Sequence, residues 1–299
     1  MKNKGALNLF KLAAVFFTMT ASLTFCACTK GQDAPRTNSQ EKPQILTSSY
    51  VPYTLVKNII KDKADISMLM PPGVEPHSFE PLPKDILKVA KAPFFFYVDR
   101  KLEPWAYEIK KDKALALAKG ITNNSYTHLW MDFDKAFLMT KNATYDLQKF
   151  YPELEPYLNA NLIVFEKEIN KLKEAYTNGL KNCRFRDIYH IGHLAFEELA
   201  QNYKLNFKPL VNSSESQEPS PKDILEMIKQ IKERNIKYIF TEEALPPEMA
   251  ALIAAQTNTQ ILMLYTIEHI TKEEFDRQIT YQDFMYKNLE NLKIGLECK

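Results

Sequence analysis

The stretch PELEPYLNANLIVFEKEINKLKEAYTNGL, residues 152–180, is one amphipathic pattern with no glycine before Gly179. Apolar side chains recur at steps of three or four, which places them on one face of an α-helix: Leu158, Leu162, Phe165, Ile169, Leu172 and Tyr176. A helix of about 25 residues spans about 37 Å. We therefore expect residues 151–180 to form one long rigid helix that runs along both halves of the molecule and joins them. An ordinary helix inside a single domain is the alternative.

Short apolar runs alternate with amphipathic runs on both sides of this helix. Before it we expect strands at 44–47, 65–70, 94–98 and 114–118, with helices at 52–61, 83–91 and 103–110. After it we expect strands at 187–191, 206–210, 236–240 and 260–264, with helices near 193–201, 221–234, 246–255 and 281–292. This alternation is typical of parallel sheets. The sequence thus predicts an α/β fold of two lobes, residues 44–150 and 181–299, each a small parallel sheet flanked by helices.

The first 28 residues have the features of an export signal. Lysines 2, 4 and 11 precede an apolar run at residues 12–25, which is shorter than the roughly 20 residues of a membrane span. The run ends in LTFCACTK, residues 23–30, which resembles the lipobox of bacterial lipoproteins and implies acylation of a cysteine. Cys28, which follows Ala27, fits that pattern better than Cys26, which is the alternative acceptor. Phe25 stands where that pattern prefers leucine, and a plain secretory signal is the alternative. Residues 29–43 are polar with Gly and Pro, as expected of a flexible tether.

Composition argues against several function classes. The 39 basic and 37 acidic side chains nearly cancel, so no strong field would attract nucleic acid. The seven glycines never form GxGxxG or GxxxxGK, which disfavours nucleotide binding. Beyond the signal, Cys183 and Cys298 are the remaining cysteines. An exported protein permits a disulfide between them, but the sequence alone leaves that pairing open.

Three histidines follow predicted strands. His77, His128 and His193 come after strands of both lobes, and ligands in open α/β sheets bind beyond the carboxyl ends of the strands. Two facing lobes would therefore bring these imidazoles to one cleft, and three neutral imidazoles suit zinc. His190 is expected inside a strand and His269 in a loop. For any single loop histidine a solvated or capping role is the competing interpretation, since the spacing is not that of a compact metal motif.

Four motifs carry a resemblance to a known family. They are PPGVEPHSFEPLPKDI (71–86), THLWMDFDKA (127–136), YHIGHLAFEELAQNYKL (189–205) and SSESQEPSPKDILEMIKQIKERNIKYIFTEEALPPEMA (213–250). In order and context they resemble the solute-binding proteins of zinc and manganese ABC importers, over residues 45–292. The resemblance implies two lobes joined by a rigid helix, with one divalent ion in the cleft held by His77, His128 and His193.

The fourth ligand departs from the family pattern. An aspartate often follows the last strand in the family, and the matching place in ILMLYTIEHI, residues 261–270, holds Ile267. Glu268, His269 or a water could complete the site, and we favour Glu268. A His-rich loop, frequent in zinc members, is absent between His77 and His128. Three nitrogen ligands nevertheless suit zinc better than manganese.

The sequence therefore predicts capture of a divalent transition metal outside the cytoplasm and its delivery to an ABC importer permease in the inner membrane. We expect zinc, with manganese or iron as alternatives, and a monomer that is periplasmic or at the cell surface on a lipid anchor. We expect no catalysis and no nucleic-acid partner. An exported zinc-dependent hydrolase is a second hypothesis, with Glu75 or Glu80 as general base, although no HExxH motif is present. A surface adhesin or scaffold with a structural metal is a third.

Overall fold

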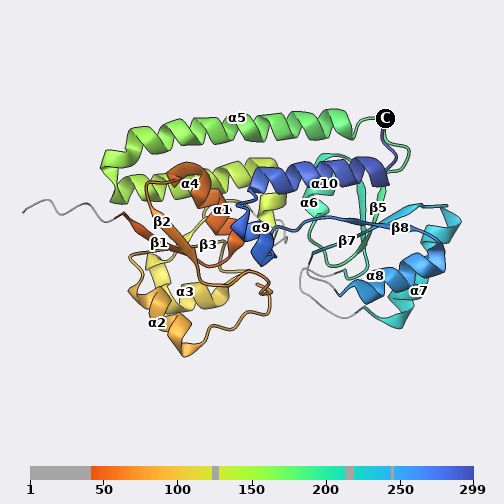
Figure 1. Cartoon of the computed structure of the whole chain (residues 1–299), viewed down its shortest axis with the longest axis horizontal. Helices are drawn as coiled ribbons and strands as arrows, with labels where there is room; N and C mark the ends of the chain where they lie inside the picture. Colours follow the sequence, from red (N-terminus) through yellow and green to blue (C-terminus); the bar gives the residue numbers. More distant parts are fainter. Residues whose placement is uncertain (1–41, 123–127, 213–218, 244–245) are drawn as a thin grey trace, which may run out of the picture. The chain divides into compact units, whose positions relative to one another are not determined.

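Two four-stranded parallel sheets form the framework of the residues that the computed structural model describes, which are 42–122, 128–212, 219–243 and 246–299 (Figure 1). The first has the order β2-β1-β3-β4 and the second the order β6-β5-β7-β8. The predicted α/β fold with a parallel sheet in each lobe is confirmed. The strands are β1 (Gln44–Thr47), β2 (Asp65–Met68), β3 (Phe94–Tyr97), β4 (Leu115–Ala116), β5 (Asp187–Ile191), β6 (Asn206–Pro209), β7 (Tyr238–Thr241) and β8 (Gln260–Met263).

Helices alternate with the strands along the chain, as expected for parallel sheets. They are α1 (Tyr50–Ile60), α2 (Pro83–Lys91), α3 (Pro104–Lys110), α4 (Phe133–Phe150), α5 (Glu155–Gly179), α6 (Glu197–Asn202), α7 (Pro221–Glu233), α8 (Pro247–Thr257), α9 (Lys272–Asp276) and α10 (Tyr281–Gly295). Short 3-10 turns occur at Lys111–Lys113, Leu129–Met131 and Pro152–Leu154. Within the described ranges, none of these helices combines the length and apolar character of a transmembrane span. The predicted signal and its Cys28 lie outside the described residues.

Each sheet is covered on both faces, which explains its continuous apolar strands. All four side chains of β3 are buried, and they alternate between two cores. Phe94 and Phe96 pack in the core that contains α1, α4 and α5, whereas Phe95 and Tyr97 pack in the core beneath α2 and α3. In the second sheet Tyr189 faces α7 and α8 in the same way. The four aromatic residues of β3 thus form a strand that is buried on both faces.

The long helix α5 begins at Glu155 and ends at Gly179, inside the predicted range (Figure 1). Five of the six predicted apolar positions are buried, but Leu162 is only partly so. Asn161 is buried instead, because its side-chain amide donates a hydrogen bond of 2.8 Å to the Ile59 carbonyl at the end of α1. At the other end the Tyr176 hydroxyl donates to the Met285 carbonyl in α10 at 2.7 Å. A single core runs along α5 and reaches both sheets, so the connection is stiff.

Several element bounds differ from the sequence-based expectation; β4, for example, covers Leu115–Ala116 instead of 114–118, and β7 covers Tyr238–Thr241 instead of 236–240. We predicted a helix from His193, but α6 begins at Glu197 and residues 192–196 are irregular. That irregular segment lets His193 turn away from the helix direction toward Glu242, its hydrogen-bond partner. In addition, Cys183 and Cys298 form a disulfide that joins the segment after α5 to the segment after α10. The pairing that the sequence left open is therefore present.

Candidate metal centre

Four loops or turns beyond strand ends bring His77, His128, His193 and Glu268 together, and we call these four the metal cluster. His77 lies in the proline-rich loop after β2, and His128 precedes the 3-10 turn Leu129–Met131. His193 follows β5, and Glu268 lies between β8 and α9. The cluster thus takes two side chains from each half of the chain. Three of them are almost completely buried, and the His77 side chain is 7% exposed.

The donor atoms of the cluster converge on one point. The His128 Nε2 lies 3.3 Å from the His77 Nε2 and 2.9 Å from the His193 Nε2. The Glu268 carboxylate lies 3.1 Å from the His77 Nε2, 3.0 Å from the His128 Nε2 and 3.6 Å from the His193 Nε2. All four ligand atoms are within 4.8 Å of one another. The three Nε2 atoms lie too close together for all three imidazole rings to carry a positive charge.

These separations fit a tetrahedral cation. With metal–ligand bonds of about 2.0–2.1 Å, the corners of a tetrahedron lie roughly 3.3 Å apart. The nitrogen–nitrogen and nitrogen–oxygen distances scatter around that value. Three imidazoles and one carboxylate form a donor set that zinc accepts and that fills all four positions. The residues therefore fit a zinc ion held without an open catalytic position.

Glu242 orients one of the rings. Its carboxylate lies 2.9 Å from the His193 Nδ1, so His193 donates from that nitrogen and leaves Nε2 for the cluster. Glu242 is 4% exposed and follows β7. Gly192 makes this contact feasible, since a Cβ at that position would lie 2.7 Å from the Glu242 carboxylate and 2.4 Å from the His190 ring. His190 itself packs between Phe196 and Phe207 and is not part of the cluster.

The carboxylates control the protonation of the cluster. Burial alone would lower the pKa of His193, but Glu242 and Glu268 raise it to about 10. Burial likewise opposes protonation of His77, yet Glu268 raises its pKa. For His128 burial dominates and lowers the pKa. Burial would raise the pKa of Glu268, but the surrounding histidines hold it well below its ordinary value. A metal ion must therefore displace protons that Glu268 attracts into the cluster.

His269, the other candidate from the sequence, has a different partner. Its Nε2 lies 2.7 Å from the Glu75 carboxylate, and this contact joins loops of the two halves. Glu75 also accepts a hydrogen bond from the His77 backbone N–H at 2.9 Å. Burial would raise the pKa of Glu75, but the hydrogen bond with His269 lowers it. Glu75 and His269 line a cavity of about 300 Å³ beside the metal cluster. The structure thus brings Glu268, and not His269, next to the three histidine Nε2 atoms.

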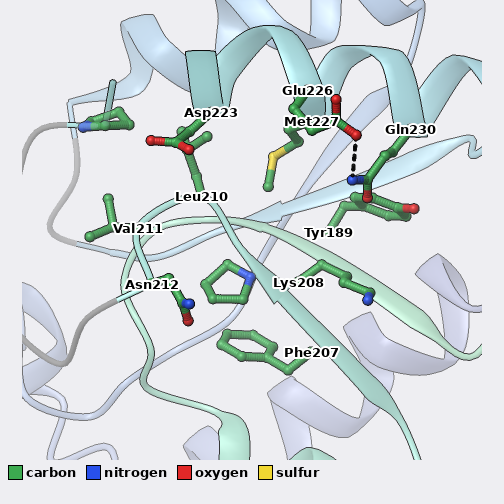
Figure 2. A pocket seen from close by; sticks show the side chains of 12 residues that line it. Tyr189, Phe207, Lys208, Leu210, Val211, Asn212, Asp223, Glu226, Met227 and Gln230 are labelled. Atoms are coloured by element: carbon green, nitrogen blue, oxygen red, sulfur yellow. Dashed lines mark hydrogen bonds between the residues drawn. The ribbon is translucent and has the colours of Figure 1, made fainter. Parts of the chain in front are cut away.

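A larger cavity of about 510 Å³ lies elsewhere, between β6 and α7 (Figure 2). Figure 2 shows Phe207 and Lys208 of β6 on one side and Met227 on the other, with the Glu226 carboxylate accepting a hydrogen bond from the Gln230 amide. Its lining contains no histidine and no cysteine among the described residues. This cavity is therefore separate from the metal cluster and lacks the nitrogen ligands that zinc prefers.

Sequence reasoning identified the four cluster residues but missed the groups around them. Glu242 lies inside the motif at residues 213–250, but sequence reasoning assigned that carboxylate no role. It also gave no role to Glu243, or to Trp130, whose indole N–H donates to the Thr266 carbonyl at 2.7 Å. A run of two glutamates directly after a buried strand, TEE at residues 241–243, was the available signal. Two acidic groups at a strand end near predicted ligands are typical of groups that support a metal site.

Comparison with known proteins places the chain as a whole in a family. The family described as zinc-uptake complex component A, periplasmic, matches residues 45–295. The high-affinity zinc uptake system protein ZnuA of Bacillus subtilis is 29% identical over 319 residues, which cover 98% of each chain. The zinc-binding protein AdcA of Streptococcus pyogenes serotype M18 is 28% identical over 326 residues. That match covers 97% of this chain and 61% of AdcA, so the chain spans about three fifths of that relative.

A solved structure extends the similarity to three dimensions. The metal-dependent lipoprotein YcdH from Bacillus subtilis is 31% identical to this chain, with a TM-score of 0.77. The superposition covers 85% of this chain and 100% of YcdH. The family match spans both sheets, the long helix α5 and every residue of the metal cluster. The chain therefore belongs to the family of the periplasmic zinc-uptake complex component A.

Proposed function

We propose that this protein binds one zinc ion with high affinity outside the cytoplasm and delivers it to an ABC importer. The observation that carries the proposal is the convergence of three histidine Nε2 atoms and one carboxylate at tetrahedral spacing in a buried cluster. His77, His128, His193 and Glu268 are the proposed ligands. Members of the family and the relatives named above are zinc-uptake or zinc-binding proteins, which supports zinc as the cargo.

The donor set favours zinc over manganese. Manganese prefers shells rich in oxygen and with six positions, whereas the cluster offers three nitrogens and one carboxylate. Manganese and iron are the two competitors to test. The general order of affinities for divalent metals already places zinc above both, so the test asks whether the site prefers zinc by more than that order predicts. We expect zinc to occupy the site fully, and manganese to bind only when it is in large excess.

The chain is a carrier and not an enzyme. A catalytic zinc keeps a position open for water, but here four protein side chains supply the full tetrahedral set. Neither glutamate that the hydrolase hypothesis names as a general base belongs to the metal cluster. Glu75 contacts His269, and Glu80 is exposed.

We further propose how the chain is anchored and organised. Cleavage before Cys28 and acylation of that cysteine would fix the protein to a membrane, with residues 29–43 as the tether. The lobes would comprise residues 44–150 and 181–299, with 151–180 as the linking helix. The monomer would then present the cleft side of both lobes to the permease. The metal-dependent lipoprotein YcdH, which is similar in sequence and fold, supports the lipid anchor.

Substitution of Glu268 and of His269 shows which of the two is the fourth ligand. We expect Glu268→Gln to reduce zinc affinity by more than about 100-fold, since it removes the negative ligand from a buried site. His269→Gln should retain full stoichiometry with an affinity within about tenfold of wild type, because His269 contacts Glu75 instead of the cluster. Competition titration against a chelator, with metal analysis of the dialysed protein, measures both. The reverse ranking of the two variants would assign the site to His269.

Zinc affinity should depend on pH. The raised pKa values of His77 and His193 mean that the metal-free cluster keeps protons at neutral pH that zinc must expel. Affinity should therefore be highest above the His193 pKa of about 10, fall as the pH drops through that value, and continue to fall down to about pH 5. Calorimetry in two buffers of different ionisation enthalpy should show release of roughly one to two protons per zinc at neutral pH. Binding without proton release, and an affinity that stays flat over this range, would argue against ligation by these rings.

A further inference from the structure

The backbone immediately before Glu268 is strained. Ile267 has a φ of +68°, in the left-handed region that β-branched residues avoid. Its side chain is fully buried and packs in the core that joins both halves. A residue keeps such a conformation only where its surroundings determine it. The Glu268 loop therefore needs groups that hold it in place.

Glu243 supplies most of that restraint. One oxygen of its carboxylate, Oε2, accepts a hydrogen bond of 2.9 Å from the Thr266 backbone N–H. The other, Oε1, accepts from the Thr266 hydroxyl at 2.9 Å and from the Ile267 backbone N–H at 3.0 Å. Glu243 thus accepts hydrogen bonds from Thr266 and Ile267, the two residues that precede Glu268. It is not a member of the metal cluster.

The same segment is tied from the opposite half of the chain. The Trp130 indole, two residues after His128, donates to the Thr266 carbonyl at 2.7 Å. Both polar groups of the Thr266 backbone are therefore engaged, one by each half. The Trp130 ring also meets the His128 ring edge to face at 5.2 Å. These contacts couple the direction of Glu268 to the position of His128.

Glu242 and Glu243 each hold a different member of the metal cluster in position. Glu242 holds the His193 ring through Nδ1, and Glu243 holds the loop that carries Glu268. Building on the proposed zinc site, we infer that Glu243 is a positioning residue for Glu268. It fixes the Thr266–Ile267 backbone so that the carboxylate meets the three histidines, and so sets the geometry and affinity of the site without touching the metal.

The test compares Glu243→Gln with Glu268→Gln, the double variant and wild type. Glutamine keeps the shape of Glu243, but its N–H₂ group cannot accept hydrogen bonds from the backbone and hydroxyl donors. The Thr266–Ile267 backbone therefore loses part of the hydrogen bonding that holds it in place. Zinc affinity should fall about 10- to 100-fold, the usual cost of losing a group that supports a ligand. The visible absorption of Co²⁺ bound in the site should move toward that of Glu268→Gln. In the Glu268→Gln background the second change should cost less than about twofold, because its target is already absent.

Matched controls separate positioning from general stability. Glu248→Gln makes the same chemical change at an exposed residue of α8 and should leave affinity and the Co²⁺ spectrum unchanged. If Glu243→Gln does not fold, Thr266→Val removes one of the three hydrogen bonds to Glu243, together with the long one of 3.4 Å that the Glu268 backbone N–H donates to the Thr266 hydroxyl. This variant should shift the spectrum in the same direction, whereas Thr266→Ser, which keeps the hydroxyl, should leave it as in wild type.

Each outcome has a definite meaning. A Glu243→Gln protein that unfolds more easily, yet binds zinc and Co²⁺ as wild type does, would show a purely structural role and overturn the inference. Fully additive losses in the double variant would also overturn it, since Glu243 would then act through another group. A wild-type chain that binds neither metal would overturn the proposed function itself. The inference is supported by weaker binding, the spectral shift and non-additivity together.

Discussion

His128→Ala should reduce zinc affinity by more than about 100-fold and leave the purified protein without zinc after dialysis. His128 is 1% exposed, and its Nε2 lies within 3.3 Å of two other histidine nitrogens and 3.0 Å from the Glu268 carboxylate. It is the central member of the cluster, so its loss leaves two rings and a carboxylate with an open corner. Metal analysis after competition among zinc, manganese and iron measures the effect, and His77→Ala and His193→Ala should behave alike.

The matched control is His190→Ala, which also deletes a fully buried imidazole. The His190 Nε2 lies 3.8 Å from the Glu242 carboxylate, too far for a hydrogen bond, and the ring contacts Phe196 and Phe207. This variant should lose stability through the cavity it leaves but keep one zinc per chain. Equal loss of zinc in His128→Ala and His190→Ala would mean that damage to packing, and not ligation, explains the result.

Removal of the disulfide should cause the largest change in stability. The bond between Cys183 and Cys298 closes a loop with a sequence separation of 115 residues. The chain-entropy account gives about 4–5 kcal/mol of stabilisation for a loop of that size. We expect Cys183→Ser with Cys298→Ser to lower the free energy of unfolding by about that amount. Denaturant unfolding of the metal-free protein measures it, because bound zinc would add its own stabilisation.

Zinc binding is the control for the disulfide variant. Neither cysteine belongs to the metal cluster, so the double serine variant should keep one zinc per chain at temperatures where it is folded. Wild-type protein treated with a reductant should shift by a similar amount in the unfolding experiment. A change below about 1 kcal/mol in both would mean that the bond does not constrain the unfolded chain as a cross-link of this span should.

Much of the fold is predictable from the sequence because it follows from apolar periodicity. The β1 and β5 strands have the predicted bounds, and α5 lies within the predicted range. These elements are decided locally, by alternating or continuous apolar runs and by a stripe at helical spacing. The sequence does not predict that Asn161, and not Leu162, is buried against the core. The burial of Asn161 depends on a hydrogen bond to a carbonyl at the end of α1, far away in the sequence.

The metal cluster could be predicted only in part, for a physical reason. Histidines after strand ends are visible in the sequence, and parallel sheets place such ends at one edge. The direction of Glu268 is not visible, because it depends on a left-handed conformation at Ile267, which the residue type opposes. Tertiary contacts from Glu243 and Trp130 determine that conformation, and no local pattern encodes them.

The most direct test of the central claim is a crystal structure of the mature chain with bound zinc, supported by absorption spectroscopy at the zinc edge. We predict one zinc ion at about 2.0–2.2 Å from the Nε2 atoms of His77, His128 and His193 and from a Glu268 oxygen. A zinc ion bound elsewhere, or three imidazoles turned away from each other with no metal between them, would contradict the account.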